Sequence, residues 1–285
     1  TEPFKGLFTQ GMVCHETYKD QNNNWVSPDE IISKDGKKYL KDNTLQEIKV
    51  GPSESMSKSK KNTIDPENIV EIYGADSVRF FILADSPPER DVQWSDEGML
   101  SSYKFIQKIW ALSQSIFEIS KLKLDDDKEE IDIFTNQMID KVNQALEKFR
   151  YNILIAIFHE IYSYYRKLSE QNKNFNNLLE NYKKILIIMS PVIPHLASEC
   201  LIKINHDENI KWPIVDKKYL ITSKNLIVIQ VNGKKRSTLL VEKNLTEKEL
   251  VQLIKDKELI VNYFAHGELI KTIYIKDRLI NFIKK

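Results

Sequence analysis

The sequence predicts a multidomain α+β protein, and three observations lead to this prediction. The chain has 285 residues, 41% hydrophobic and 29% charged, which provides for about two domains. Apolar residues recur with helical spacing from about residue 95 to residue 204. On either side, short apolar segments alternate with Asn, Gly and Lys clusters typical of strands and turns. We therefore expect a β-rich segment, an antiparallel helical bundle and a small α+β module, in that order.

Composition and cysteine usage argue against a membrane protein, a zinc protein and a disulfide-rich protein. No apolar run reaches the roughly 18 residues of a membrane span, and the most apolar stretch, Ile185 to Met189, is soon followed by Pro191. We recognise no signal peptide. Cys14 and Cys200 have no second cysteine or histidine at metal-ligand spacing, so we expect neither a zinc site nor a disulfide framework. We expect a cytoplasmic protein without membrane contact.

The first part of the chain combines a β-rich insertion with two short helices. Residues 17–54 contain short apolar pieces between polar clusters, and we expect strands and turns there. Asp65, followed by a proline, predicts the start of a helix, with Asp65 as its N-cap. Gly74 is expected to end this helix, and a second helix is expected from about Asp76 to Leu83.

Four amphipathic segments predict the bundle. A fourth helix, Leu178 to Ile204, is expected to bend at Ser190–Pro194, because its prolines remove backbone donors. The expected buried faces of the first three helices are Met99, Tyr103, Ile106, Trp110 and Phe117; Ile131, Phe134, Met138, Val142, Ala145 and Phe149; and Ile153, Ile157, Ile161 and Tyr164.

The last part of the chain predicts a compact α+β module. Leu226–Val231 is expected to form a strand that turns at Asn232-Gly233 and returns along Ser237–Val241. Thr246–Glu249 is a capping box, opening a helix to about Phe264, and Gly267 is expected to stop it. The expected last strand is Ile270–Ile275.

Charge is unevenly distributed between this module and the rest of the chain. Residues 216–285 carry 15 Lys and Arg against 8 Asp and Glu, whereas the first 215 residues carry 27 against 33. A basic terminal module is typical of contact with a polyanion. A solvated, lysine-rich surface explains the same charge equally well.

A lysine-rich run, Ser55-Met56-Ser57-Lys58-Ser59-Lys60-Lys61-Asn62, lies between the β-rich segment and the capped helix. Its composition is typical of an exposed linker. Its position, after Gly51-Pro52, also suits a flexible loop that closes over a phosphate-bearing ligand. A lysine ammonium is a compact cation suited to charge on phosphoryl oxygens. From composition and position alone, both interpretations stay open.

Motifs in and after this run resemble a known family. Met56–Asn62 resembles the KMSKS signature loop of class I aminoacyl-tRNA synthetases, with Ser55 in place of the first lysine and Lys58 as the second. Tyr73–Phe81 is similar to the "yGADtaRlf" segment that follows that loop in this class, and Pro87–Asp96 resembles the "PPe.d..Wsd" segment of the leucine enzymes.

Two later motifs extend the resemblance over nearly the whole chain. Met189–His195, with Glu199, resembles the "aPf.PH.aEe" break of the leucine, isoleucine and valine enzymes. Val228–Arg236 resembles the "vQVNGKvR" strand and turn of bacterial leucyl-tRNA synthetases. The Cys-rich zinc module of isoleucine enzymes and the coiled-coil arm of valine enzymes are not recognisable here. The resemblance implies a carboxyl-terminal fragment of a leucyl-tRNA synthetase, with the HIGH half and the editing domain upstream of Thr1.

The resemblance also implies a domain division. The expected domains are the end of a Rossmann-like catalytic domain at 1–97 (leucine-specific insertion about 17–54, signature loop 55–59, stem-contact segment 63–97), an anticodon-binding-type helical bundle at 98–222, and an α+β tRNA-binding domain at 223–285.

The implied activity is the ATP-dependent ligation of leucine to its tRNA by a cytoplasmic, monomeric enzyme. The resemblance implies that Lys58 stabilises the adenylation transition state, and that Mg²⁺ acts with ATP in the full enzyme without a metal site in this fragment. The fragment alone is expected to be inactive. The implied ATP-binding loop is Ser55, Met56, Ser57, Lys58 and Ser59, and the implied tRNA contacts are Lys234, Lys235 and Arg236. Alternatives are a non-catalytic tRNA-binding module and an isoleucyl- or valyl-type synthetase.

Several other polar residues have competing interpretations. Asp76 and Arg79 suit a catalytic carboxylate and a phosphate clamp, but an ion pair that fixes their helix is favoured. Asn62 is expected to shape the loop. We expect Lys60 and Lys61 to be solvated, Trp94 to be a packing anchor and His195 to be a partly buried bundle residue. His15 has no partner at nucleophile or metal spacing.

Overall fold

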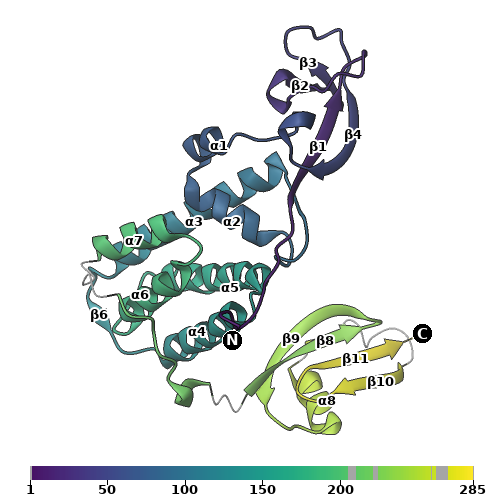
Figure 1. Cartoon of the computed structure of the whole chain (residues 1–285). Helices are drawn as coiled ribbons and strands as arrows, with labels where there is room; N and C mark the ends of the chain where they lie inside the picture. Colours follow the sequence, from purple (N-terminus) through teal and green to yellow (C-terminus); the bar gives the residue numbers. More distant parts are fainter. Residues whose placement is uncertain (1, 205–209, 221–223, 258, 261–268, 285) are drawn as a thin grey trace. The chain divides into compact units, whose positions relative to one another are not determined.

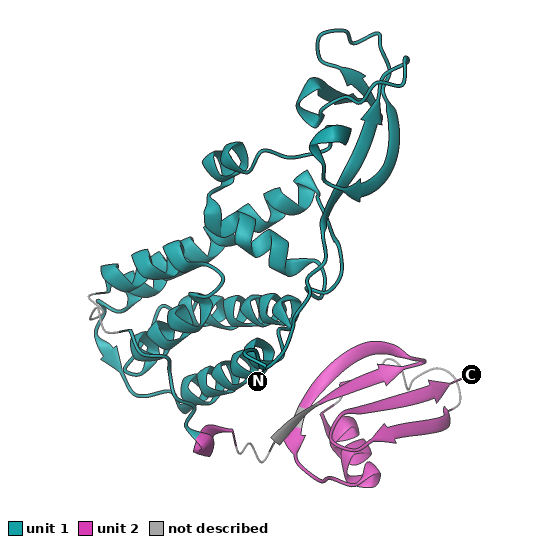
Figure 2. Cartoon of the chain, viewed as in Figure 1, with its two compact units in different colours: residues 1–216 teal, residues 217–285 magenta. Residues whose placement is uncertain are grey.

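The fold is given by a computed structural model that describes the chain except residues 1, 205–209, 221–223, 258, 261–268 and 285 (Figure 1). The chain forms two compact units, Thr1–Asp216 (unit 1) and Lys217–Lys285 (unit 2), shown in Figure 2. The described residues include eight α-helices and eleven strands, which confirms the α+β class. The three-domain division at residues 97/98 and 222/223 stays a prediction.

Unit 1 begins with a β-rich segment. Its elements are β1 (Val13–Lys19), the 3-10 helix η1 (Pro28–Glu30), β2 (Ile31–Lys34), β3 (Lys37–Leu40), β4 (Lys49–Ser55), the 3-10 helix η2 (Lys58–Lys60) and β5 (Val92–Gln93). Strand β1 pairs antiparallel with β4 and parallel with β5, and β2 pairs with β3. The insertion has a small core of its own, formed by Tyr18, Val26 and Ile48.

The residues before the lysine run are part of a strand, so the predicted glycine-flanked loop is wrong on this side. Gly51 and Pro52 lie within β4. The Thr17 hydroxyl donates to the Pro52 carbonyl oxygen at 3.0 Å. A Cβ on Gly51 would lie 2.5 Å from that hydroxyl. The glycine therefore permits close strand pairing.

Two short helices follow the lysine run as the caps predict. They are α1 (Pro66–Tyr73) and α2 (Ala75–Ala84). The Asp65 carboxylate accepts a hydrogen bond from the Glu67 amide at 3.0 Å, and Gly74, with φ of 80°, lies between the helices. Both boundary predictions are confirmed. Phe80 of α2 reaches the bundle core, whereas Phe81 packs with Val92 and Met99.

Five helices form the bundle. They are α3 (Asp96–Ile119), α4 (Glu129–Glu147), α5 (Tyr151–Ser169), α6 (Leu178–Met189) and α7 (Pro194–Lys203), with the short parallel pair β6 (Leu124–Asp125) and β7 (Asn174–Phe175) at one end. The single bent helix predicted for Leu178–Ile204 is two helices, because the segment from Ser190 to Ile193 leaves the helical path before Pro194 starts α7.

Parts of the predicted core faces are wrong. Phe149 follows the end of α4 with a φ of 52° and is 45% exposed, and Ile153 is 42% exposed. On α3, the centre of the buried stripe is formed by residues that include Ile109 and Ile116. The predicted aromatic residues lie along one edge of this stripe. Those aromatic residues, Tyr103, Trp110 and Phe117, are only half-buried.

Unit 2 is a sheet covered on one face by a helix. Its elements are the 3-10 helix η3 (Lys217–Tyr219), β8 (Lys224–Val231), β9 (Lys234–Glu242), α8 (Glu247–Asp256), β10 (Leu269–Ile275) and β11 (Leu279–Lys284), with strand order β10-β11-β8-β9 (Figure 1). Leu250 and Ile254 of α8 pack with Ile229, Ile280 and Phe282 of the sheet.

The turn and cap predictions for unit 2 are confirmed, whereas the length of its helix is wrong. Asn232 and Gly233 have φ of 50° and 76° between β8 and β9, as a two-residue turn requires. Thr246 forms the capping box with Glu249. Helix α8 ends at Asp256, and the predicted end and stop residues, at 264 and 267, lie outside the described residues. Strand β11 was not predicted.

Candidate functional site

The lysine run is an ordered connection between β4 and α1. Ser55 ends β4, and the amide of Met56 donates to the carbonyl oxygen of Val13 on β1 at 3.1 Å. The Ser57 hydroxyl then caps η2 by accepting from the Lys60 amide at 3.3 Å. Lys61 reverses the chain with a φ of 53°. The run is therefore a short helical turn attached to the sheet.

Asn62 fixes the base of this turn. Its side chain is fully buried. The amide oxygen accepts from the Ser57 amide at 2.8 Å, and the amide nitrogen donates to the carbonyl oxygens of Glu54 at 3.1 Å and His15 at 3.2 Å. One side chain thus joins the start of the turn, the end of β4 and strand β1. The expectation that Asn62 shapes the loop is confirmed.

The three lysines of the turn differ in their surroundings. The Lys60 ammonium pairs with the Glu54 carboxylate, so the prediction that Lys60 is solvated is wrong. Lys58 and Lys61 are exposed and form no ion pair with any described residue. In the structure, Lys58 is an exposed and unpaired cation on a turn that Asn62 holds in place. Its catalytic role, and the ATP-binding role of Ser55–Ser59, stay predictions.

Asp76 and Arg79 each bind the bundle and not one another, so the ion pair predicted between them is wrong. The Asp76 carboxylate accepts from the Leu196 amide at 2.7 Å and from Nδ1 of His195 at 2.8 Å. The Arg79 guanidinium donates to the carbonyl oxygens of Pro191 at 2.7 Å and Val192 at 3.0 Å. Both side chains therefore join α2 to the junction between α6 and α7.

This arrangement completes two helix ends. The N-cap position of α7 is Ile193, which has no side-chain acceptor, and Asp76 supplies the carboxylate that the first turn of α7 needs. Its negative charge lies at the positive end of the α7 dipole, and the Arg79 cation lies just beyond the C-terminal end of α6. We call Asp76, Arg79 and residues 191–196 the α2–bundle latch.

The remaining polar and aromatic residues are placed as follows. Trp94 packs edge to face on Phe81, with ring centroids 5.2 Å apart, which supports its role as a packing anchor. His195 is 74% exposed at its side chain, so the expectation of partial burial is wrong; Asp76 holds it at the surface. His15 is buried, and burial lowers its pKa, because the charged imidazole would lose its solvation.

The predicted tRNA contacts lie on the exposed start of β9. Lys234 and Lys235 follow the Asn232-Gly233 turn, and the pairing of β8 with β9 shifts register at Ile229/Gln230. This shift leaves Arg236 as an additional residue in β9, as in a β-bulge. The three cationic residues are exposed. Their contact with RNA stays a prediction.

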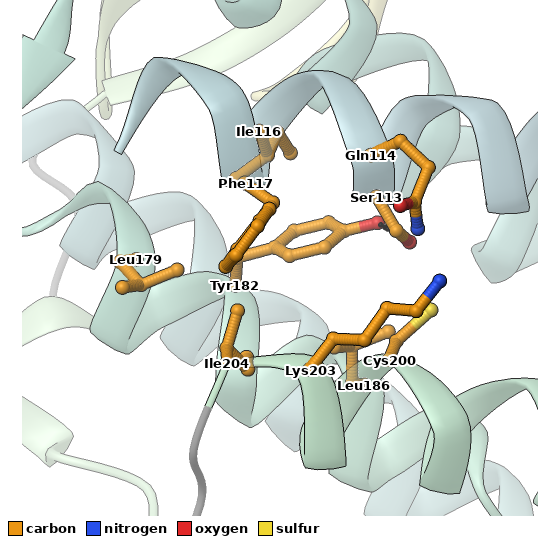
Figure 3. A pocket seen from close by; sticks show the side chains of 10 residues that line it. All are labelled: Ser113, Gln114, Ile116, Phe117, Leu179, Tyr182, Leu186, Cys200, Lys203 and Ile204. Carbon is orange, nitrogen blue, oxygen red and sulfur yellow. Dashed lines mark hydrogen bonds between the residues drawn. The ribbon is translucent and has the colours of Figure 1, made fainter. Parts of the chain in front are cut away.

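A hollow between α3, α6 and α7 is too small to be a ligand site. It has a volume of about 10 Å³, no more than one water molecule needs. Figure 3 shows the Tyr182 hydroxyl directed towards Ser113, and the two oxygens are 2.8 Å apart. Cys200 and Lys203 also line the hollow, and burial raises the pKa of the Cys200 thiol. This hollow is a packing feature of the bundle.

The described residues offer neither a metal site nor a membrane-spanning helix. Outside the gaps given above, no group of three or more His, Cys, Asp or Glu residues could hold a metal ion. Among the same residues, no helix is long and apolar enough to cross a membrane.

Family models match two parts of the chain. Residues 48–95 match the tRNA synthetases class I (I, L, M and V), a range that contains the lysine run and both latch residues of α2. Residues 128–252 match the anticodon-binding domain of tRNA ligase, and this match extends from unit 1 into unit 2.

Individual relatives match nearly the whole chain. The leucine–tRNA ligase of Hyphomonas neptunium is 33% identical over 288 residues, and that of Rickettsia bellii is 35% identical over 286 residues. In both comparisons 99% of this chain is covered, and it spans 34% of the relative. The chain thus spans about a third of the length of the curated relatives it matches.

A solved structure shares the fold. In the ternary complex of Agrobacterium radiobacter K84 agnB2 LeuRS with tRNA and LeuAMS, one chain matches with a TM-score of 0.57 at 20% identity. The match covers 81% of this chain and 31% of that chain.

Proposed function

Because the chain belongs to the leucine–tRNA ligase family of class I aminoacyl-tRNA synthetases, we propose that it supplies the signature ATP loop and the tRNA-binding domains of such a ligase. We assign residues 1–97 to the end of the catalytic domain, 98–222 to the anticodon-binding-type bundle and 223–285 to a terminal tRNA-binding domain. The proposed enzyme is a cytoplasmic monomer that ligates leucine to its tRNA with ATP.

The observation that supports this proposal most directly is the clamped loop. Asn62 fixes the base of η2, while Lys58, within η2, stays exposed and outside any ion pair of the described residues. A loop that delivers a cation to a phosphate needs both properties, a defined base and an unpaired charge. Lys60 lacks the second property because Glu54 neutralises it.

In the proposed reaction, a carboxylate oxygen of leucine attacks the α-phosphorus of ATP. A bond forms between them, the bond to the bridging oxygen breaks, and pyrophosphate leaves with the electron pair. Negative charge grows on the leaving pyrophosphate, and the Lys58 ammonium stabilises it. A ribose hydroxyl at the 3′ end of the tRNA then attacks the carbonyl carbon of the adenylate. The ester bond forms, the bond between the carbonyl carbon and the phosphate oxygen breaks, AMP leaves with the electron pair, and the hydroxyl proton goes to solvent. Residues 55–62 include three lysines and no carboxylate, so they do not suit a metal, and Mg²⁺ would be carried by ATP.

Lys58→Ala tests this role in an enzyme that contains this sequence together with the remaining two-thirds of the family's length. Losing one preorganised charged donor costs about 3 kcal/mol, or about a hundredfold in rate. We expect leucine-dependent ATP–pyrophosphate exchange to fall at least tenfold. Lys41→Ala, at an exposed lysine of the inserted segment outside this loop, should change it less than threefold. Equal effects of the two substitutions would remove the special role of Lys58.

The chain alone is expected to form no leucyl-adenylate, because the proposal places most of the leucine site in the other two-thirds of the enzyme. The same exchange assay on the isolated chain tests this. Clear leucine-dependent exchange would show that the chain holds a complete site and would contradict the proposal.

A non-catalytic tRNA-binding module is the second candidate function, and the basic unit 2 favours it. Exposed Lys234 and Lys235 can reach a phosphate backbone, and each contact adds about 0.9 to the salt slope of binding to duplex nucleic acid. Charge reversal of both lysines should lower the slope for leucine tRNA by about two. Lys248→Glu on α8 is the control and should change it by less than one. Equal binding of an isoleucine tRNA would indicate a general polyanion binder.

A further inference from the structure

The signature loop shares a hollow with a turn of the inserted segment. The hollow measures about 350 Å³. Its lining residues are Ser27, Asp29 and Glu30 from the turn, and Lys58, Lys61 and Thr63 from the loop or the residues just after it. Two acidic residues therefore line the same hollow as two lysines, although some 30 residues separate them in the chain.

The carboxylates are held in place by their own turn. Ser27 is the N-cap of η1, and its backbone amide donates to the Glu30 carboxylate at 3.0 Å. The Ser27 hydroxyl donates to the Asp29 carboxylate at 3.0 Å. Pro28, at the first position of η1, restricts the backbone between them. The turn therefore places two acidic residues at the hollow, and Ser27 holds both of their carboxylates.

The two lysines that line the hollow form no ion pair with any described residue. Glu54 engages Lys60, whereas Lys58 and Lys61 are exposed and form no ion pair in the described part of the chain. Neither lysine forms a direct ion pair with Asp29 or Glu30 in this arrangement. The two pairs of charges interact across solvent, where attraction is modest and depends on salt.

We propose that the Ser27–Glu30 turn is a counter-charge that competes with polyphosphate for Lys58 and Lys61. This inference rests on the proposed function of the loop. Without an anionic ligand, the carboxylates attract the two lysines. A nucleoside triphosphate or pyrophosphate must replace that attraction, and the turn regains the lysines when pyrophosphate leaves. The inserted segment thereby adjusts the affinity of the loop for its anionic ligand.

Lysine reactivity measures this interaction in the chain itself. Acetic anhydride reacts with exposed lysine amines, and a lysine that is drawn towards fixed carboxylates is shielded from the reagent. The double variant Asp29→Asn, Glu30→Gln keeps the acceptor atoms of the turn but removes both charges. Trace acetylation at pH 8, read by peptide mass spectrometry against Lys248, should show a rate at Lys58 at least twofold higher in the double variant.

A matched control removes other carboxylates of the inserted segment. Asp35→Asn, Asp42→Asn should leave the Lys58 rate unchanged, because neither residue lines the hollow. An unchanged Lys58 rate in the Asp29→Asn, Glu30→Gln variant would overturn the inference, as would an equal increase in the control.

Inorganic pyrophosphate provides the second measurement. At low salt it should protect Lys58 from acetylation, with a half-protecting concentration at least twofold lower in the Asp29→Asn, Glu30→Gln variant than in the unaltered chain. The same half-protecting concentration in both proteins, or no protection in either, would overturn the competition. The adenylation assay on Lys58→Ala judges the function of the loop separately, so failure of the counter-charge and failure of the proposed function give different results.

Discussion

Removing the Asp76 carboxylate should destabilise unit 1 far more than removing an ordinary helix cap. In Asp76→Ala, the amides of His195 and Leu196 lose their acceptor. A lost N-cap costs about 1 kcal/mol, and a charge at a helix end contributes about 0.5 kcal/mol. The Leu196 amide is buried and would stay unpaired, which adds about 1.5 kcal/mol. We expect a loss of about 3 kcal/mol in the free energy of unfolding.

Tryptophan fluorescence during urea denaturation reports this loss selectively. All four tryptophans, Trp25, Trp94, Trp110 and Trp212, lie in unit 1. Unit 2 can therefore unfold separately without obscuring the transition of unit 1. The midpoint and slope of the fluorescence curve give the free energy of unfolding of unit 1.

Asp65→Ala is the matched control for this measurement. Asp65 caps α1, a helix without buried residues, and lies outside the latch. We expect a loss of about 1 kcal/mol or less for this variant. Asp76→Asn, which keeps one acceptor oxygen, should lie between the two. If Asp76→Ala costs no more than Asp65→Ala, the reasoning about the latch is refuted.

Three further predictions concern buried polar groups of unit 1. Asn62→Leu removes the side-chain hydrogen bonds that hold the loop. Trypsin should therefore cut within the loop at least tenfold faster. The control Asn22→Leu, in an exposed turn, should change the cleavage rate less than twofold. Burial lowers the pKa of His15, so its contribution to stability is complete above about pH 6.5 and is lost as the pH falls below that value. The urea midpoint should therefore be lower at pH 5.5 than at pH 7.5. The difference should be smaller in His15→Phe. Tyr165→Phe leaves the buried Thr135 hydroxyl, 2.8 Å from the Tyr165 oxygen, without its partner; urea denaturation should show a loss of about 1 kcal/mol.

Features set by neighbouring residues could be predicted from the sequence. The Asp65 cap, the Asn232-Gly233 turn and the Thr246–Glu249 capping box each depend on residues within four positions of one another. Their physics is local, because a side chain meets a backbone group of its own turn. These predictions held in detail.

Features that depend on distant segments could not be predicted in the same way. Asp76 meets partners 119 and 120 residues further along the chain, and no local pattern indicates that an aspartate of one helix completes another. The pairing of Lys60 with Glu54 depends on how the turn folds back along β4. Phe149 has the apolar character of its helix face but lies past the helix end, where the backbone leaves the helical path.

The two cysteines have a practical consequence for following the loop in solution. Cys14 is 4% exposed and Cys200 is 3% exposed, and burial keeps the Cys200 thiol protonated and unreactive. A single cysteine introduced at an exposed position, such as Ser59, should therefore react with a maleimide dye ahead of the native thiols. The native sequence is thus a ready host for site-specific fluorescence, and movements of the lysine-rich loop can be recorded without first replacing either native cysteine.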